Sequence, residues 1–421
     1  MSDAISQLKS LMQGCDLTFF GGAPYVYHCH HYNLFHDQSV DDVLGEERGF
    51  ALRSRAAREA FRPLLAAVFE AAGATRPVER VELATQIFAA FGHGRPSISV
   101  GPDGTGTATG THLHYGFAWR EKYGSQVKRF DPVDAVTAGF AAAATELAHG
   151  LPHGSVSGAE SQCVAMQHPQ CRIDLTRVTP EASPEQLSER MMSDYVRAPE
   201  SGLWEDDVAA IADGLRGFLG GVAGDERGLV HAFNVFVTAH LSNYYNETIF
   251  EAVRELEQRS PAVVGAAESL FREAGHVCVF NTFGNILLSP EWESMVAKPG
   301  DDPERIVAYC LAIARSLGFG HWLVPEMEVG KRMVMRTTTN YEAPFYLHRY
   351  GKSVKPRCYI TTGAALAIAV LAHRVKWSEG PSLDQAYYDA LFRGEGLGWE
   401  AEVTRDQTMG DEVTEIVVTR R

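Results

Sequence analysis

Histidine is the residue type whose placement in this chain most clearly suggests chemistry. Four of the 16 histidines fall between His28 and His36, and three of them lie inside the run YVYHCHHYNLF that ends at Phe35. Aromatic surface combined with a few polar groups is typical of a pocket wall that orients an organic ligand, and neutral imidazole can accept a proton near pH 7. We therefore expect a pocket whose substrate-binding residues are Cys29, Tyr32 and Asn33 and whose catalytic residues are His28, His30, His31, His112 and His114.

His112 and His114 are separated by one residue, so on a strand both side chains would point to the same face. Two or three of the clustered imidazoles could also hold a second metal ion with open coordination positions. The structural alternative is a set of half-exposed histidines beside a loop, without a chemical role.

A second motif has the spacing of a metal site. Glu160 precedes Cys163 by three residues, and Cys171 follows eight residues later, with a turn supplied by His168-Pro169. Thiolates combined with a carboxylate suit Zn²⁺, which favours four ligands and needs no redox change. Four protein ligands leave no open position, so this zinc is expected to be structural; the alternative is a pair of buried cysteines without a metal.

The segments around these residues recur further along the chain. Residues 244–246 repeat His31-Tyr32-Asn33 after 213 positions, and residues 337–341 repeat 111–115 after 226 positions, in the same order. Alanine-rich segments that follow Gly139 and Gly363 are predicted to be helices whose small side chains let backbones approach closely.

These repeats predict an α+β fold built from two copies of one domain. The first copy spans residues 1–175, the second spans 206–421, and a linker with three prolines joins them at 176–205. Chance similarity between Gly- and Ala-rich helices is the alternative. The copies differ in chemistry, because Leu241, Asn243, Tyr244, Thr338 and Asn340 stand where the first copy carries His28, His30, His31, His112 and His114.

Around Glu160, Cys163 and Cys171-Arg172, preceded by a Gly-containing helix, the chain resembles the 4-vinyl-reductase (hydrocarbon-binding) domain family. That family occurs in bacteriochlorophyll-biosynthesis proteins and in the sensory domains of phenol-responsive activators. The resemblance implies a fold like that of trafficking-particle subunits, present once per copy. It also implies a pocket lined by a Trp and a His before the zinc hairpin, which adds Trp119 to the substrate-binding set.

The same resemblance implies a zinc held by Glu160, Cys163, Cys171 and a fourth ligand five residues before the helix glycine. Asp134 stands at that place, where the family has Cys; Asp131, His149 and His153 are the alternatives. In the second copy Cys358 has the family's position, but Asp406 and Thr414 replace the two hairpin cysteines. The second copy is therefore expected to be degenerate, without a metal.

Composition excludes several classes of protein. The formal net charge of −15 argues against binding nucleic acid or an anionic membrane surface. The seven cysteines are an odd number, and no signal segment or long apolar run is present, so we expect a soluble, cytoplasmic protein with reduced thiols.

Together these features lead us to expect a zinc-containing enzyme that binds and transforms a small aromatic or hydrophobic metabolite by acid–base or metal-assisted chemistry. A non-catalytic sensor or carrier and a structural scaffold are the two alternatives. The two copies would form an internal pseudo-dimer, and a homodimer of the whole chain is a further possibility.

Overall fold

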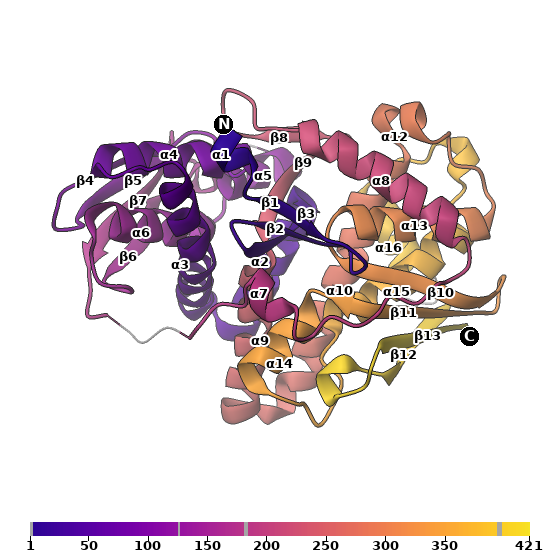
Figure 1. Ribbon diagram of the computed structural model, residues 1–421. Helices are drawn as coiled ribbons and strands as arrows, with labels where there is room; N and C mark the ends of the chain where they lie inside the picture. Colours follow the sequence, from indigo (N-terminus) through magenta and orange to yellow (C-terminus); the bar gives the residue numbers. More distant parts are fainter. Residues whose placement is uncertain (1–2, 125–126, 181–183, 394–397) are drawn as a thin grey trace.

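The computed structural model describes residues 3–124, 127–180, 184–393 and 398–421, and Figure 1 shows the N-terminal half of the chain beside the C-terminal half. The N-terminal half contains, in chain order, α1 (Asp3–Ser6), β1 (Lys9–Met12), β2 (Leu17–Phe20), β3 (Ala23–Cys29), α2 (His30–Leu44), α3 (Glu46–Ala71), α4 (Pro77–Ala90), β4 (Ser97–Val100), β5 (Gly106–Gly110), α5 (His114–Tyr123), α6 (Ala135–His149), β6 (Val156–Gln162) and β7 (Cys171–Arg177). Two helices then lead to the second half, α7 (Glu189–Met192) and α8 (Glu205–Gly221).

The C-terminal half contains β8 (Val230–Ala232), β9 (Val235–Leu241), α9 (Ser242–Arg259), α10 (Val264–Cys278), a π-helical turn (Val279–Phe283), α11 (Gly284–Leu287), α12 (Pro290–Met295), α13 (Pro303–Ser316), β10 (Gly320–Glu328), β11 (Arg332–Asn340), α14 (Glu342–Tyr350), α15 (Tyr359–Arg374), α16 (Gln385–Phe392), β12 (Trp399–Arg405) and β13 (Thr414–Arg420). The expected mixture of helices and strands is confirmed, and the strand pairs of all three sheets in the described residues are antiparallel. The expected linker at 176–205 holds the end of β7, α7 and the first residue of α8; its residues 181–183 lie outside the described residues.

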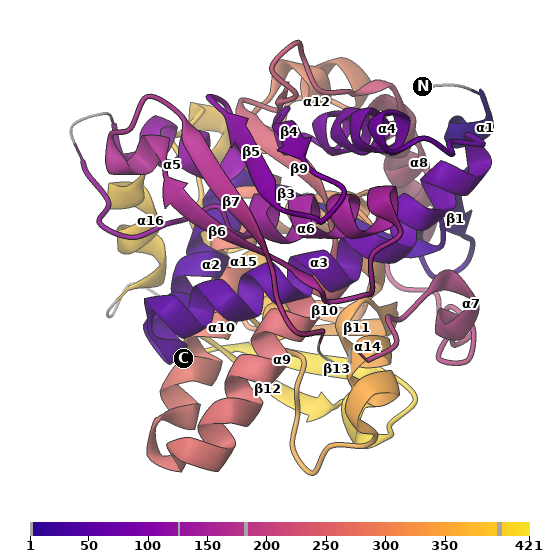
Figure 2. The ribbon, with the colours of Figure 1, turned by 90° about the vertical axis from the view of Figure 1, so that its left-hand side faces the viewer.

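Each half has a four-stranded antiparallel sheet, and the strand order is the same in both. The order is β4-β5-β7-β6 in the N-terminal half and β10-β11-β13-β12 in the C-terminal half. In Figure 2 the N-terminal sheet lies in front of α6, and α3 passes behind that helix. Both halves thus place a hairpin beside the start of an alanine-rich helix.

A third sheet joins the halves. Its order is β1-β2-β3-β9-β8, and β3 pairs with β9 in antiparallel register from Tyr25 opposite Leu241 to Cys29 opposite Val237. Since β3 runs directly into α2, and β9 into α9, both helices begin at the join and contact each other.

The helices α6 and α15 lie in the core of their halves. Asp134 caps α6, because its Oδ1 accepts a hydrogen bond from the Thr137 amide at 3.1 Å. A Cβ atom added at Gly139 would lie 2.1 Å from the Ser54 carbonyl oxygen of α3. The predicted close approach of backbones at this glycine is therefore confirmed.

Among the described residues, no helix combines the length and the apolar character needed to cross a bilayer.

Candidate functional site

The β6–β7 hairpin gathers the three metal-ligand candidates of the N-terminal half. A short 3₁₀ turn at Val164–Met166 follows Cys163, and Gln167 ends it in the left-handed region at φ 66°. This turn brings donor atoms of Glu160, Cys163 and Cys171 within 4.8 Å of one another. All three residues are buried.

The spacing of these atoms fits a tetrahedral zinc ion. The Sγ atoms of Cys163 and Cys171 are 3.6 Å apart, and two thiolates on one zinc at about 2.3 Å each would lie roughly 3.8 Å apart. Glu160 Oε2 accepts hydrogen bonds from the amides of Val133 and Asp134, both at 2.8 Å. Glu160 Oε1 is buried and makes no hydrogen bond of ordinary geometry within the described residues, so one oxygen is held and the other is available as a ligand.

The electrostatics of this hairpin also suit a cation. Burial raises the pKa of the Glu160 carboxyl, and the hydrogen bond to Cys163 together with burial raises the pKa of Cys171 well above its ordinary value. Three buried acidic groups repel one another when ionised, and a dication among them would remove that cost.

Asp134 is the best placed of the four candidates for the fourth ligand. Its Oδ2 is buried without an ordinary hydrogen bond in the described chain, and burial followed by the charge of Glu160 raises its pKa to about 8. It does not belong to the group of donor atoms within 4.8 Å of one another, so its side chain would have to move to share a metal with them.

The other three candidates are less favourably placed. Asp131 is only half-buried. His149 lines a separate surface groove beside α4 and β4, and His153 Nε2 lies 2.8 Å from the Glu59 carboxylate.

In the β12–β13 hairpin of the C-terminal half, hydrogen-bonded side chains stand where the N-terminal hairpin has its metal-ligand candidates. Asp406 Oδ2 accepts from the amides of Arg357, at 2.7 Å, and Cys358, at 3.2 Å, as Glu160 does in the first half. The buried carboxylate of Glu342 accepts from the amides of Ile360 and Thr361 at the start of α15. Within the described residues, no group of three metal-binding side chains forms here.

Sequence reasoning did not identify Gly116, whose missing side chain leaves space for the two thiols of the N-terminal half. Gly116 occupies the repeat position of Glu342, and a Cβ atom on it would lie 2.9 Å from Cys171 Sγ and 3.1 Å from Cys163 Sγ. A side chain at 116 would therefore crowd the two thiols.

The structure contradicts the strand predicted for His112 and His114. The strand β5 ends at Gly110, His112 lies half-buried in the bend that follows, and His114 is the buried first residue of α5. The two imidazoles consequently have different surroundings. His112 contacts Thr111 and the Phe117 ring, whereas His114 points into the interior.

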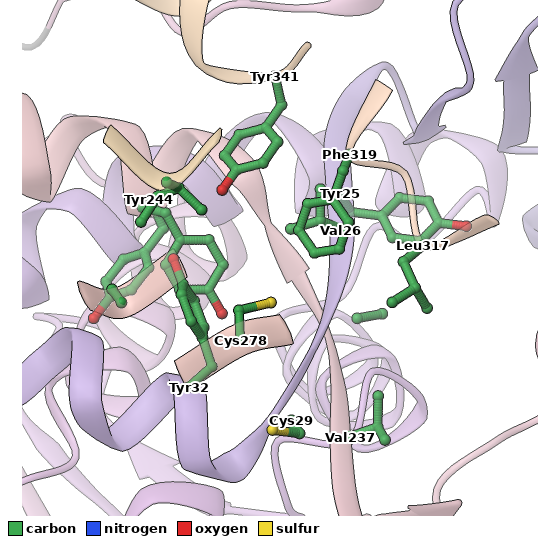
Figure 3. Close-up of a cluster of buried hydrophobic side chains, with 14 of the residues drawn as sticks. Tyr25, Val26, Cys29, Tyr32, Val237, Tyr244, Cys278, Leu317, Phe319 and Tyr341 are labelled. Atoms are coloured by element: carbon green, nitrogen blue, oxygen red, sulfur yellow. The ribbon is translucent and has the colours of Figure 1, made fainter. Parts of the chain in front are cut away.

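A buried cluster, here called the His–Tyr centre, forms where the two halves meet. It consists of His28, Tyr32, Asn33 and His114 from the N-terminal half and Thr238, His240, Tyr245, Cys278 and Tyr341 from the C-terminal half. Figure 3 shows Tyr32, Tyr244, Cys278 and Tyr341 gathered in this part of the core, beside β3.

Asn33 connects the two halves within this centre. Its Nδ2 lies 2.9 Å from His114 Nε2 and 3.0 Å from Thr238 Oγ1, and its Oδ1 accepts from the Tyr245 hydroxyl at 2.6 Å. Because the Asn33 amide donates to Nε2, His114 carries its hydrogen on Nδ1.

His28 forms the second part of the centre. Its ring stacks on Tyr32 with 3.7 Å between centroids and meets the edge of Tyr245 at 4.9 Å. Its Nδ1 lies 3.4 Å from Cys278 Sγ, at the point where α10 continues as a π-helical turn.

Several polar atoms of the His–Tyr centre and its neighbour His93 are buried without a hydrogen bond of ordinary geometry in the described part of the chain. They are His28 Nε2, His114 Nδ1, both ring nitrogens of His93, and the hydroxyls of Tyr32 and Tyr341. Burial lowers the pKa of His28, His114 and His240 well below the ordinary value. These imidazoles are therefore neutral at pH 7 and act as hydrogen-bonding groups.

The other predicted pocket residues lie at different places. His30 Nδ1 accepts from the Phe236 amide at 3.3 Å, and the His31 ring lies 3.9 Å from the His30 ring. Trp119 packs against Tyr123 and Arg129. Cys29 is buried beside the centre (Figure 3). In the described residues, Glu160, Cys163 and Cys171 make up the group that could hold a metal, and no three histidines do.

Sequence reasoning did not identify the residues that the C-terminal half contributes to the His–Tyr centre. It also did not identify the buried ion pair that lies next to the centre. Tyr244 and Tyr245 carried a signal, since they match His31 and Tyr32 in the repeat. The buried ion pair between Arg53 and Asp37, at 3.0 Å, carried none, because neither residue belongs to a motif.

Comparison with protein-family models and with curated proteins gives no match. Among solved structures, the chain is similar to the crystal structure of the phenol-responsive sensory domain of the transcription activator PoxR with phenol. The sequence identity is 18%, the match covers 42% of this chain and 89% of that chain, and the TM-score is 0.32. A likeness at that score does not establish a shared fold.

Proposed function

We propose that this chain is a zinc-containing protein that binds a small, uncharged organic molecule in the His–Tyr centre. The observation that carries the proposal is the group of buried ring nitrogens and hydroxyls without hydrogen bonds of ordinary geometry. Among them His28 Nε2 has no polar protein partner in the described part of the chain, and the Tyr32 and Tyr341 hydroxyls have only each other nearby there. Within the same residues, His93 and His114 Nδ1 have only weak contacts with the backbone of Ala239 and Gly92. Buried polar groups are nearly always satisfied, so such a concentration calls for a partner other than the described side chains.

The surroundings define the ligand's chemistry. The rings of Tyr32, Tyr245 and His28 offer aromatic surface, while His28 Nε2 and the hydroxyls of Tyr32 and Tyr341 offer hydrogen bonds. The lowered pKa values of His28 and His114 keep these groups neutral, which favours a neutral ligand such as a hydroxylated aromatic ring.

The same neutrality favours a carrier or sensor over an acid–base enzyme. A general base works best when its pKa lies near the working pH, and burial moves the pKa of His28 and His114 well below it. We therefore place binding, rather than proton transfer, at this centre.

We further propose that Glu160, Cys163 and Cys171 hold a structural zinc ion, with Asp134 completing the set, in the first of two copies of a 4-vinyl-reductase-like domain. The shared strand order of the two four-stranded sheets supports the duplication. So does the matching place of Asp134 and Cys358, which both directly precede the core helix of their half. The zinc would hold the hairpin on the start of α6.

The ligand is tested by comparing two Tyr→Phe variants. Bound small molecules are first sought by native mass spectrometry of the purified chain, and binding is then measured calorimetrically with phenol and catechol as the simplest hydroxylated rings. Tyr32→Phe removes a hydroxyl whose one polar neighbour among the described residues is the Tyr341 hydroxyl, at poor hydrogen-bond geometry, so it should weaken binding by about tenfold with little change in the unfolding temperature. Tyr123→Phe, at a residue that is 42% exposed, should change neither. A protein that carries no small molecule and binds neither probe would overturn the proposal.

The metal is tested by elemental analysis of the purified chain. Wild type should contain one zinc per chain, Cys163→Ala should contain none, and Cys310→Ala, at a buried thiol outside the hairpin, should retain it. His112→Ala should also retain the zinc. Equal zinc contents in wild type and Cys163→Ala would remove the metal from the proposal.

A further inference from the structure

A surface groove runs along the seam between the two halves, away from the His–Tyr centre. It is bounded by α3 of the N-terminal half, α9 of the C-terminal half and β6, and its volume is about 820 Å³. Small-molecule sites commonly have volumes of about 300–1,000 Å³. None of the residues that form the His–Tyr centre lines this groove.

The groove is basic, although the chain as a whole is acidic. The charged residues that line it are Arg48, Arg55, Arg58, Arg254, Arg259, Glu251 and Glu255. The lining thus has three positive charges in excess, whereas the whole chain has a net charge of −15. All the positive charges are guanidiniums, whose planar donor forks match phosphate and carboxylate oxygens.

Three of these arginines have close partners in the protein. Arg48 and Arg259 both contact Glu255, at 2.8 and 3.2 Å. The side chain of Arg58 is only 9% exposed, and its Nε donates to Glu59 at 3.0 Å. These contacts fix the walls and floor of the groove.

Arg55 and Arg254 are the two arginines of the groove whose guanidinium groups have no close carboxylate partner of their own among the described residues. The nearest carboxylate to Arg55 is Glu247 at 4.0 Å, and Arg349 already contacts that carboxylate at 3.0 Å. Arg254 lies over the Tyr350 ring at 4.4 Å and makes no ion pair within the described residues. Arg55 is on α3 and Arg254 on α9, so the available guanidiniums come from opposite halves.

We propose that this groove binds a small organic molecule that carries phosphate groups, through Arg55 and Arg254. Phe50, Leu52 and Val178 also line the groove and would contact the carbon skeleton. A ligand held by both helices stabilises the folded chain by an amount that grows with the logarithm of the ligand concentration above its Kd, because it binds the folded state and not the separated helices. The proposal is independent of any ligand in the His–Tyr centre.

The test is calorimetric titration of the full chain with inorganic pyrophosphate, ADP and citrate, at 50 and 200 mM NaCl. Pyrophosphate and ADP should bind, and their binding should weaken at the higher salt because the attraction is electrostatic. The double variant Arg55→Gln/Arg254→Gln should weaken binding by at least about tenfold, the equivalent of one lost charge-assisted hydrogen bond.

The matched control is Arg332→Gln/Arg393→Gln. It removes the same charge at two partly exposed arginines outside the groove, and it should leave binding within about twofold. Citrate binding as tight as or tighter than that of pyrophosphate would overturn the assignment to phosphate groups. The proposal is overturned if no probe binds to a chain with native circular dichroism, or if both double variants lose affinity equally.

Discussion

Arg53 shows at the scale of one residue how the His–Tyr centre is supported. Its side chain is 1% exposed, and its guanidinium contacts Asp37 at 3.0 Å and Asp41 at 2.7 Å. Asp37 in turn accepts from the Tyr244 hydroxyl at 2.7 Å and lies 2.9 Å from His36. One buried cation therefore holds two carboxylates, and through them the polar side chains beneath the centre.

Replacing Arg53 with methionine should be strongly destabilising. The variant keeps the apolar volume but leaves the buried carboxylate of Asp37 without an arginine partner and that of Asp41 with Arg129 alone, at 3.1 Å, a loss of about 3–5 kcal/mol in the free energy of unfolding. Urea denaturation followed by circular dichroism measures it. Arg393→Met removes an ion pair with Asp389 whose arginine is 62% exposed, and it should cost no more than about 1 kcal/mol. Equal losses in the two variants would contradict this account.

The residues of the metal hairpin could be predicted from the sequence because they are close in the chain. Glu160, Cys163 and Cys171 lie within twelve positions, and one turn suffices to bring them together. The His–Tyr centre could not be assembled in the same way. Its halves are more than 200 residues apart, and nothing local specifies that Asn33 meets Tyr245 and Thr238.

At the scale of the element, the packing of α6 on α3 depends on one glycine. The space for a side chain at Gly139 is taken by the Ser54 carbonyl, the Ala57 methyl and the Arg58 amide of α3. The same arrangement recurs where Gly363 of α15 meets Arg272 and Gly275 of α10. The two helices can approach closely only because these positions lack a Cβ atom.

Gly139→Ala should therefore destabilise the chain, although alanine favours helices. A contact of 2.1 Å with backbone forces the helices apart, which should cost about 1–3 kcal/mol. Gly214→Ala on α8 is the control, because nothing lies within 4 Å of its added Cβ atom, and it should stabilise by about 0.5–1 kcal/mol. Thermal and urea unfolding of both variants give the comparison; stabilisation by Gly139→Ala would refute the packing account.

The alanine-rich helices could be predicted from composition, but the start of α5 could not. His112 and His114 have the spacing of two residues on one face of a strand, yet the helix begins at His114 without a capping side chain. Leu113 precedes it in extended conformation and makes no side-chain cap, so the usual signal of a helix start is missing. Tertiary packing, not local sequence, decides this boundary.

At the scale of the whole molecule, Asp16 ties the N-terminal strands to the C-terminal half. It sits in the turn between β1 and β2 with φ 53°, a left-handed conformation that Asp and Asn tolerate. Its carboxylate contacts Arg216 of α8 at 3.0 Å and His321 of β10 at 2.8 Å. Burial alone would raise the pKa of Asp16, but these partners hold it below the ordinary value.

This lowered pKa predicts how the contribution of Asp16 to stability changes with pH. An unfolded Asp has a pKa of about 3.9, and the folded value is lower, so the contribution is complete above that pH and is lost as pH falls through the folded pKa. The difference in unfolding free energy between wild type and Asp16→Asn should therefore be constant from about pH 5 to 6 and shrink below about pH 4. Urea titrations at several pH values measure it. A difference that grows as the pH falls would contradict the assignment.

The repeat in the sequence predicted two copies of one domain, which stays a prediction; the two outer sheets have the same strand order. The sheet that joins the halves could not be predicted. Strands pair in a register set by their neighbours, and the partner of Ala23–Cys29 lies at Val235–Leu241, far along the chain.

The pairing of β3 with β9 also bears on how this molecule could have specialised. Separate identical chains that meet across a two-fold axis must build every pocket twice, from the same residues. Here both strands belong to one chain, so their association does not depend on protein concentration, and the facing positions need not match. His28 lies opposite Thr238, while His240 lies opposite Val26. The two sides of the join therefore carry different side chains, and a mutation on one strand does not introduce the same change on the other.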